Sequence, residues 1–139
     1  MTFVVPFDGS NLSEAALARA NEFSTVLDET VLAVAVIPRD NATYAREREW
    51  MGSGEEYDIE TIITGLHEHV TEIDASANFR HEIVERYAQA GSIAKEIRRI
   101  ARNEDASLVF IGSENAGRMV TGVSSVGGRV AADDAYDVV

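Results

Sequence analysis

A chain of 139 residues, 45% of them hydrophobic, has the size of one domain and enough apolar side chains for one packed core. The absence of cysteine excludes a disulfide framework and thiolate chemistry, and the longest apolar run, residues 31–37, is far too short to span a bilayer. The formal net charge of −12 makes nucleic acid and anionic membranes poor partners, because an anionic surface repels both.

The charged residues are unusual in kind as well as in balance. Asp and Glu number 24 against 12 basic residues, and every basic residue except Lys95 is Arg. The plain interpretation is an acidic protein. The sharper interpretation is a protein that works in a salty cytoplasm, because salt screens the repulsion among its carboxylates and the Debye length falls to about 3 Å at 1 M. The scarcity of Lys, whose long stem exposes apolar surface, favours the saline interpretation. Residues 1–6 lack the features of a signal peptide, which favours a cytoplasmic location.

The first part of the chain alternates short apolar runs with a helical stripe. Residues 3–5 predict a buried strand, closed by a turn at residues 8–10. Asn11 with Glu14 three residues later forms a capping-box pattern, which predicts the start of an amphipathic helix. Residues 30–37 form an apolar run without charges, as expected of a strand that is covered on both faces.

The middle of the chain is more irregular. Residues 38–56 predict a loop or partly ordered insertion, in which Trp50 belongs either to a lid or, as we favour, to an anchor on the core. Ser53 begins another capping pattern, and residues 59–73 carry the clearest amphipathic helical stripe of the chain. Residues 79–87 mix apolar and charged side chains, which is typical of an edge strand.

The last part of the chain repeats the alternation. Gly91 opens a predicted helix, and residues 108–111 predict a fourth strand. Residues 112–128 are rich in Gly and Ser and lead into a short predicted helix, after which residues 135–139 begin a last strand. Strands that alternate with helices predict the α/β class, with a mostly parallel open sheet and helices on both faces. No linker or repeat divides the chain, so we expect a single domain over residues 1–139.

Two loops are the candidates for a binding site. Ligands of open α/β sheets bind outside the carboxyl ends of the strands, where residues 6–10 and 112–118 would meet. Glycines there let backbone N–H groups approach a phosphate, and the next helix presents its positive end to an anion. Ser124 and Ser125 at that helix start could donate hydrogen bonds to phosphate oxygens. The alternative is a tight turn with helix-capping serines, and this stretch alone favours neither.

Better-known nucleotide-binding and catalytic motifs are incomplete or absent. Gly112 and Gly117 have Walker A spacing, but Arg118 and Met119 replace the required Lys and Ser/Thr. A dinucleotide fingerprint is absent after the first strand, and Val126 occupies the glycine position of a nucleophile elbow.

Neither histidines nor carboxylates predict a metal or catalytic site. His67 and His69 are two residues apart on a predicted helix, so they point in different directions, and His81 lies on the edge strand. Acidic pairs such as Glu55–Glu56 are interpreted as solvated surface. Nothing resembles a water-activating base beside a metal, so we do not predict an enzyme, and slow nucleotide hydrolysis stays open.

Several segments, taken together, resemble the universal stress protein family and follow the family's order along almost the whole chain. They are residues 4–10, 34–36, 90–92, 108–113, and 125–126 with 129–130. The resemblance implies a five-stranded parallel sheet in a Rossmann-like or flavodoxin-like three-layer sandwich. It also implies a homodimer joined through the last strands and, in one branch of the family, ATP or AMP at the crevice, with Asp8 and Val36 beside the adenosine.

The phosphate loop that the resemblance implies is degenerate here. Gly112 matches its first glycine, but Asn115 stands at the second glycine position, Gly117 follows two residues later, and Ser124 replaces the third glycine before Ser125. Asn tolerates a positive φ better than most residues, so Asn115 is an acceptable substitute.

The sequence therefore predicts a stress-response protein that binds an adenine nucleotide at the carboxyl ends of the strands. The alternative is a dimeric interaction module with an empty crevice that regulates a partner protein, which the sequence does not name. A flavodoxin-like electron carrier is disfavoured, because the loop after the first strand lacks a Ser/Thr-rich phosphate nest.

Overall fold

The computed structural model describes residues 2–112 and 137–138. One sheet runs through them in the order β3-β2-β1-β4-β5, and every neighbouring pair is parallel. The predicted α/β class with a parallel sheet is therefore confirmed. The strands are β1 (Thr2–Pro6), β2 (Thr30–Pro38), β3 (Asn78–Val84), β4 (Ala106–Val109) and β5 (Asp137–Val138). The last of them has only two residues, whereas the other four have between four and nine.

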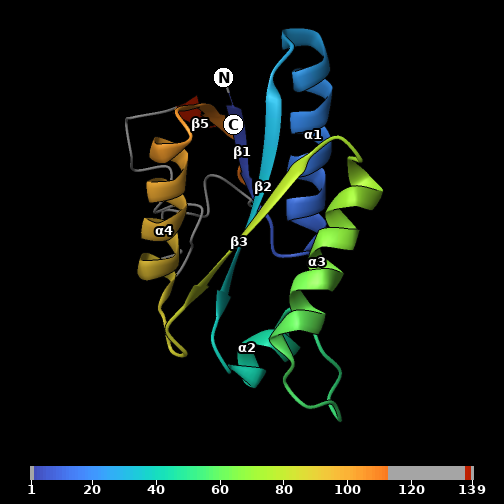
Figure 1. The fold of residues 1–139 in the computed structure, drawn as a ribbon, viewed down its shortest axis with the longest axis vertical. Coiled ribbons are helices and arrows are strands. Elements are labelled where there is room, and N and C mark those ends of the chain that lie inside the picture. Colours follow the sequence, from blue (N-terminus) through green and yellow to red (C-terminus); the bar gives the residue numbers. More distant parts are fainter. Residues whose placement is uncertain (1, 113–136, 139) are drawn as a thin grey trace.

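The described helices cover both faces of the sheet, which gives three layers (Figure 1). Helices α1 (Asn11–Leu27) and α3 (Ile59–Ile73) lie on one face, and α4 (Ala90–Asn103) lies on the other. The short helix α2 (Ala42–Glu47) follows β2 at the carboxyl end of the sheet. None of the helices in residues 2–112 is long and apolar enough to cross a membrane.

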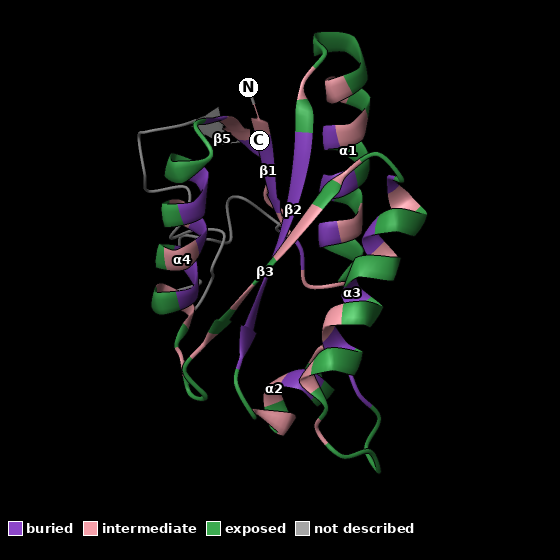
Figure 2. Ribbon diagram, viewed as in Figure 1, coloured by how far each residue is buried: buried purple, intermediate pink, exposed green. Residues whose placement is uncertain are grey.

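The central strand β2 explains how the two cores form. Its residues alternate between the faces: Ala33, Ala35 and Ile37 join the core under α1 and α3, while Leu32, Val34 and Val36 join the core under α4. All but the first residue of β2 are buried, so the strand appears as a continuous buried ribbon in Figure 2. A strand that is covered on both faces has no need of polar residues, and this accounts for the uninterrupted apolar run.

Two helix starts differ from the sequence-based expectation. Helix α1 is capped by Ser10, whose hydroxyl accepts the N–H of Ser13 at 3.2 Å, and not by Asn11, which is already helical. Helix α3 begins at Ile59, not near Ser53, because the carboxylate of Asp58 accepts hydrogen bonds from Glu60 N and the Thr61 hydroxyl. In both places the side chain that reaches the free N–H groups sets the boundary.

Two further boundaries differ as well. Residues 38–56, which were expected to form a loop or partly ordered insertion, contain α2, which Asn41 caps by accepting the N–H of Tyr44 at 3.0 Å. The fourth strand spans Ala106–Val109 instead of residues 108–111. The predicted edge strand is confirmed as β3, which pairs only with β2 in the described sheet.

The strand order reverses beside β1, and this determines where a ligand can bind. From β1 the chain moves outward to β2 and β3, and it then returns to the other side of β1 to form β4. The loops after β1 and β4 therefore leave the sheet in opposite directions and open a crevice at their carboxyl ends.

Candidate functional site

A pocket of about 110 Å³ lies at this crevice. An engineered apolar cavity of about 150 Å³ holds a benzene molecule, so the described pocket has the size of a ring rather than of a whole nucleotide. Its walls come from the ends of β1 and β2, from α2, from α4 and from the segment after β4. The lining residues are Pro6, Phe7, Asp8, Ser13, Val34, Val36, Tyr44, Arg48, Ile93, Ile97, Ile111 and Gly112.

Asp8 is held in place on the loop after β1. Its carboxylate accepts the N–H of Ser10 at 2.9 Å, and its backbone carbonyl accepts the indole N–H of Trp50 at 2.7 Å. Trp50 also packs against the core, and Met51 beside it is buried. Trp50 is thus an anchor on the core, as we favoured from the sequence, and it fastens the segment after α2 to the Asp8 loop.

Helix α2 and the residue that caps its C-terminal end, Arg48, each supply a side chain to the opposite wall of the pocket. The Tyr44 ring packs against Trp50 with 5.5 Å between ring centroids, and the guanidinium carbon of Arg48 lies 3.4 Å from the Tyr44 centroid. Contact of this kind holds the flat guanidinium group over the ring. Within the described residues Arg48 makes one ion pair, at 4.0 Å with its neighbour Glu47. Most of its donors therefore remain available to a ligand.

The electrostatics of the pocket keep Tyr44 neutral. Burial raises the pKa of the Tyr44 phenol above its ordinary value, the Arg48 cation opposes that rise, and the carboxylates of Asp8 and Glu47 add to it. Among the described lining residues Asp8 is the one anion and Arg48 the one cation. The pocket can therefore present a carboxylate acceptor, a neutral phenol and a guanidinium donor to one ligand.

The floor of the pocket is apolar. Val34 and Val36 contribute from β2, and Ile93 and Ile97 contribute from α4, all four of them buried. An apolar floor with a few polar groups at its rim is the usual composition of a site for a small organic ligand.

Gly112 lines the pocket, but its lack of a side chain has a structural reason of its own. A Cβ atom at this position would lie 2.6 Å from the backbone N of Ser13 and closer still to the carbonyl group of Leu12. The segment leaving β4 therefore passes directly against the first turn of α1, where only glycine fits. This contact explains the glycine without a phosphate, and the role of Gly112 in phosphate binding stays a prediction.

The structure brings together three of the seven residues that the sequence proposed for the site. Asp8, Val36 and Gly112 line one pocket, although they lie in three different segments of the chain. The other four, Asn115, Gly117, Ser124 and Ser125, lie outside the described residues.

Tyr44 and Arg48 were missed from the sequence because they lie in the segment that was expected to be a loop. Helix α2 has only six residues and buries only Ala45, so it carries no apolar stripe that would reveal it. The available signal was the four-residue spacing of Tyr44 and Arg48, because a helical turn between them brings the two side chains to the same side.

The histidines have structural contacts instead of a shared ligand. His69 Nε2 lies 2.8 Å from Glu14 Oε2, and its ring meets Phe7 edge-on, whereas His67 stacks on Phe79 with 4.9 Å between centroids. Within residues 2–112 and 137–138, no group of three or more His, Cys, Asp or Glu side chains is placed to hold a metal ion.

Comparison with known proteins places the chain in a family. The model of the universal stress protein family matches residues 1–132, nearly the whole sequence. This chain belongs to the universal stress protein family. A search of curated proteins found no match to it.

Solved structures of universal stress proteins share the fold. One from Archaeoglobus fulgidus has a TM-score of 0.62 at 19% identity, and the match covers 100% of this chain and 91% of that one. A universal stress protein in complex with cAMP has a TM-score of 0.57 at 20% identity, with 100% and 94% covered. An Archaeoglobus fulgidus protein in complex with dAMP has a TM-score of 0.57 at 17% identity, with 99% and 94% covered. Identities this low establish the common fold and no more.

Proposed function

We propose that this universal stress protein binds an adenine nucleotide in the pocket beside β1 and acts as a nucleotide-responsive stress protein. The observation that carries the proposal is the convergence of Asp8, Val36 and Gly112 on one ring-sized pocket at the reversal of strand order. Support also comes from the similar universal stress proteins that were solved with cAMP and with dAMP.

The described residues suggest how the base and the ribose bind. The purine lies on the apolar floor at Val36, and the Tyr44–Arg48 pair covers it from the side of α2. Rings of nucleotides commonly stack on aromatic side chains and on guanidinium planes. The hydrogen bond from Ser10 N to one oxygen of the Asp8 carboxylate holds this group in place. The carboxylate then accepts a hydrogen bond from the base or the ribose.

The phosphates extend toward the segment that follows β4. There the backbone amides of Gly112, Asn115 and Gly117 and the hydroxyls of Ser124 and Ser125 would hold them, with Arg48 as the nearby cation. The excess of carboxylates, Glu114 among them, works against any anionic ligand, so we expect modest affinity. We assign the nucleotide the role of a ligand and give no residue a catalytic role.

Titration calorimetry with ATP, AMP and adenosine, in molar KCl, tests the proposal. Ser125→Ala should weaken ATP by about tenfold or more and leave adenosine unchanged, because a hydrogen bond to a charged group is typically worth about 1.5–3 kcal/mol. Asp8→Ala should weaken adenosine and ATP alike. Arg48→Met should weaken ATP more than adenosine, because it removes a charge as well as a stacking surface.

Arg46→Met is the matched control, because it removes the same charge from α2 at a residue that does not line the pocket. It should leave all three affinities within about twofold of the wild type. If none of the three ligands binds the wild type at millimolar concentration, the proposal is wrong. Denaturing the purified protein should also release a bound adenine nucleotide, which mass spectrometry would detect.

The second candidate is a dimeric interaction module with an empty crevice that regulates a partner protein. Two observations favour it: Gly112 has a packing reason that needs no phosphate, and Asn115 and Ser124 depart from the glycine pattern. Strand β5 lies at the edge of the described sheet, and an edge strand is a natural place for a second copy to pair. Light scattering that finds only monomer over a wide concentration range would remove the dimer.

A further inference from the structure

A second groove, of about 630 Å³, lies between the end of β3 and α4. It runs along the end of β3, the turn that follows it and the first turns of α4. The two hollows share no lining residue among the described part of the chain. The proposed nucleotide function therefore does not account for this groove.

Three cations from three different segments converge on the groove. Arg39 comes from the turn after β2, Arg86 from the turn after β3, and Lys95, the only lysine of the chain, from α4. No ion pair within the described residues joins any of them to a carboxylate.

The carboxylates of the groove do not cancel this charge. Glu96 is held by Arg99 at 2.8 Å, which leaves Glu85 as the one lining carboxylate without an ion pair among the described residues. The groove is thus locally positive in a chain whose formal net charge is −12. This local reversal of charge is the feature that needs an explanation.

Two hydrogen bonds fix the turns that carry the arginines. The backbone N–H of Arg39 donates to the carbonyl of Val84 at 3.0 Å, and the side-chain amide of Asn41 donates to the carbonyl of Arg86 at 2.6 Å. The backbones that carry Arg39 and Arg86 are therefore tied together before any partner arrives. Such preorganisation lowers the entropic cost of binding.

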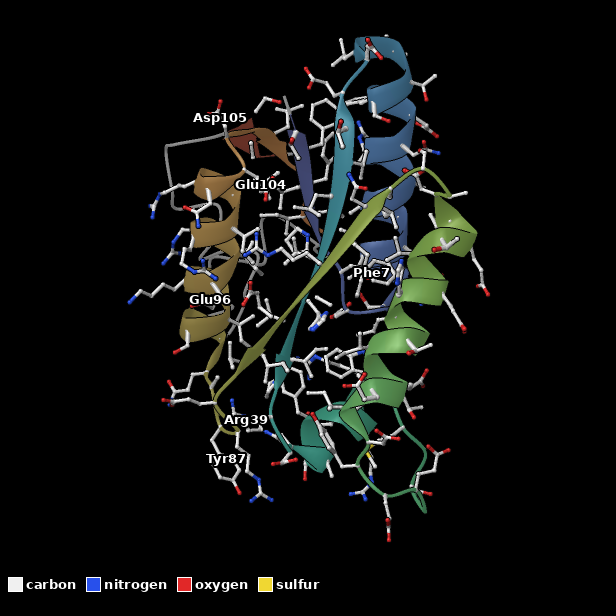
Figure 3. The ribbon with its side chains drawn as sticks, viewed as in Figure 1. Phe7, Arg39, Tyr87, Glu96, Glu104 and Asp105 are labelled. Atoms are coloured by element: carbon white, nitrogen blue, oxygen red, sulfur yellow. The ribbon has the colours of Figure 1, made fainter. Side chains whose placement is uncertain are left out.

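Apolar surface lies beside the cations. Ile83 in the groove is 40% exposed. Tyr87 follows the lining residue Arg86 in the turn and is 74% exposed, and the guanidinium carbon of Arg86 lies 5.2 Å from the Tyr87 ring centroid. Figure 3 shows Arg39 and Tyr87 at the same end of the molecule, where β3 turns into α4, and Glu96 further along α4. The turn itself is exposed in Figure 2.

We propose that this groove docks an acidic segment of a partner protein. Carboxylates of the segment pair with Arg39, Arg86 and Lys95, and an apolar side chain of the same segment covers Ile83 and Tyr87. Arginine binds carboxylates through two parallel hydrogen bonds, and tyrosine and arginine are enriched where proteins meet. A small anion would leave the apolar surface bare, because sites for small molecules enclose their ligands and this groove is open.

The charge of the whole chain gives the groove specificity. The net negative charge of the chain repels an acidic partner, whereas the cations of this groove attract it, which favours docking at the groove. At about 0.15 M salt the Debye length is about 8 Å, so distant repulsion is screened while contacts within the groove persist.

Fluorescence anisotropy at that salt concentration, with a labelled peptide of Asp and Glu around a central Phe, tests the proposal on the full chain. The wild type should bind, and Arg39→Gln, Arg86→Gln and Lys95→Gln should each weaken binding by about two- to fivefold, as expected for exposed ion pairs. The triple variant should lose about tenfold or more, and Tyr87→Ser should also weaken the peptide.

Arg19→Gln is the matched control, because it makes the same charge change on α1, which contributes nothing to the groove. It should bind the peptide as the wild type does, and a thermal melt of each variant checks that it is folded. A peptide with Asn and Gln in place of Asp and Glu should not bind.

Four outcomes would overturn the proposal. They are a triple variant that binds like the wild type, a neutral peptide that binds as well as the acidic one, and binding of inorganic phosphate but not of the peptide. The fourth is self-association that the triple variant loses while no peptide binds, which would assign the groove to a second copy of the chain. Each is distinguishable from failure of the nucleotide proposal, because the peptide assay contains no nucleotide.

Discussion

Two glycines show how differently one residue type can be used in this fold. Gly112 passes against the backbone of Leu12 and Ser13, where an added Cβ has no space, whereas an added Cβ at Gly65 in α3 would meet nothing within 4 Å. The first glycine is thus required by packing. The second only costs helix stability, because glycine has more conformational freedom to lose than alanine.

We therefore expect opposite effects from the same substitution. Gly112→Ala should destabilise the protein by about 1–3 kcal/mol, because the close contact is with backbone that cannot move cheaply. Gly65→Ala should stabilise it by roughly 0.5–1 kcal/mol. Urea denaturation of both variants measures the change in unfolding free energy. Unchanged stability of Gly112→Ala together with a loss of nucleotide binding would instead assign Gly112 to the phosphate.

The raised pKa of Tyr44 predicts a pH dependence. Burial raises the pKa of the phenol, so the stability gained from neutral Tyr44 is fully present below about pH 10 and is lost as pH rises through the folded pKa. Arg48→Gln should raise that pKa further, because the Arg48 cation favours the phenolate. Titration of the phenolate absorbance, with Tyr44→Phe as the reference that identifies the Tyr44 signal, measures it. A lower pKa in Arg48→Gln would contradict this view of the pocket.

At the scale of the elements, the start of α1 connects helix stability to the candidate site. Ser10 caps the helix by accepting Ser13 N, the Ser13 hydroxyl donates back to the Ser10 carbonyl at 2.9 Å, and Asp8 accepts Ser10 N. The loop that presents Asp8 is thereby continuous with the helix cap. A weakened cap should loosen the pocket as well as the helix.

Ser10→Ala should cost about 1 kcal/mol of unfolding free energy, the usual value of a lost N-cap hydrogen bond. Asn11→Ala should leave stability almost unchanged, since Asn11 is the first helical residue and its side chain makes no capping bond that the structure shows. Thermal or urea unfolding of the two variants compares the caps directly. A larger loss for Asn11→Ala would restore the capping box that the sequence suggested.

At the scale of the whole molecule, charge dominates the expected behaviour. The chain carries 24 acidic residues against 12 basic ones, and salt relieves the repulsion among the carboxylates. Folding stability should therefore rise steeply from low salt to molar KCl. Melting temperatures across that range test it, and a midpoint that is flat or falls with salt would remove the proposal of a saline cytoplasm.

Periodic patterns in the sequence determined most of the architecture. The apolar run of β2 predicted a strand with two covered faces, because such a strand excludes charge, and the stripe of α3 predicted an amphipathic helix. Strands alternating with helices then predicted a parallel sheet, because parallel neighbours need crossover connections. Asp8 and Val36 could be proposed for the site because they follow from the resemblance and from where strands end.

Tertiary structure alone decided the remaining details. The pocket acquires Tyr44 and Arg48 because the short helix α2 lies at the crevice. The indole of Trp50 then fastens this segment to the Asp8 carbonyl, a contact between residues 42 positions apart. Distant segments also meet where Gly112 packs against α1. The groove likewise brings together three cations from distant segments, Arg39, Arg86 and Lys95. Local periodicity reports which face a residue takes, but only the packing of distant segments decides which residues meet there.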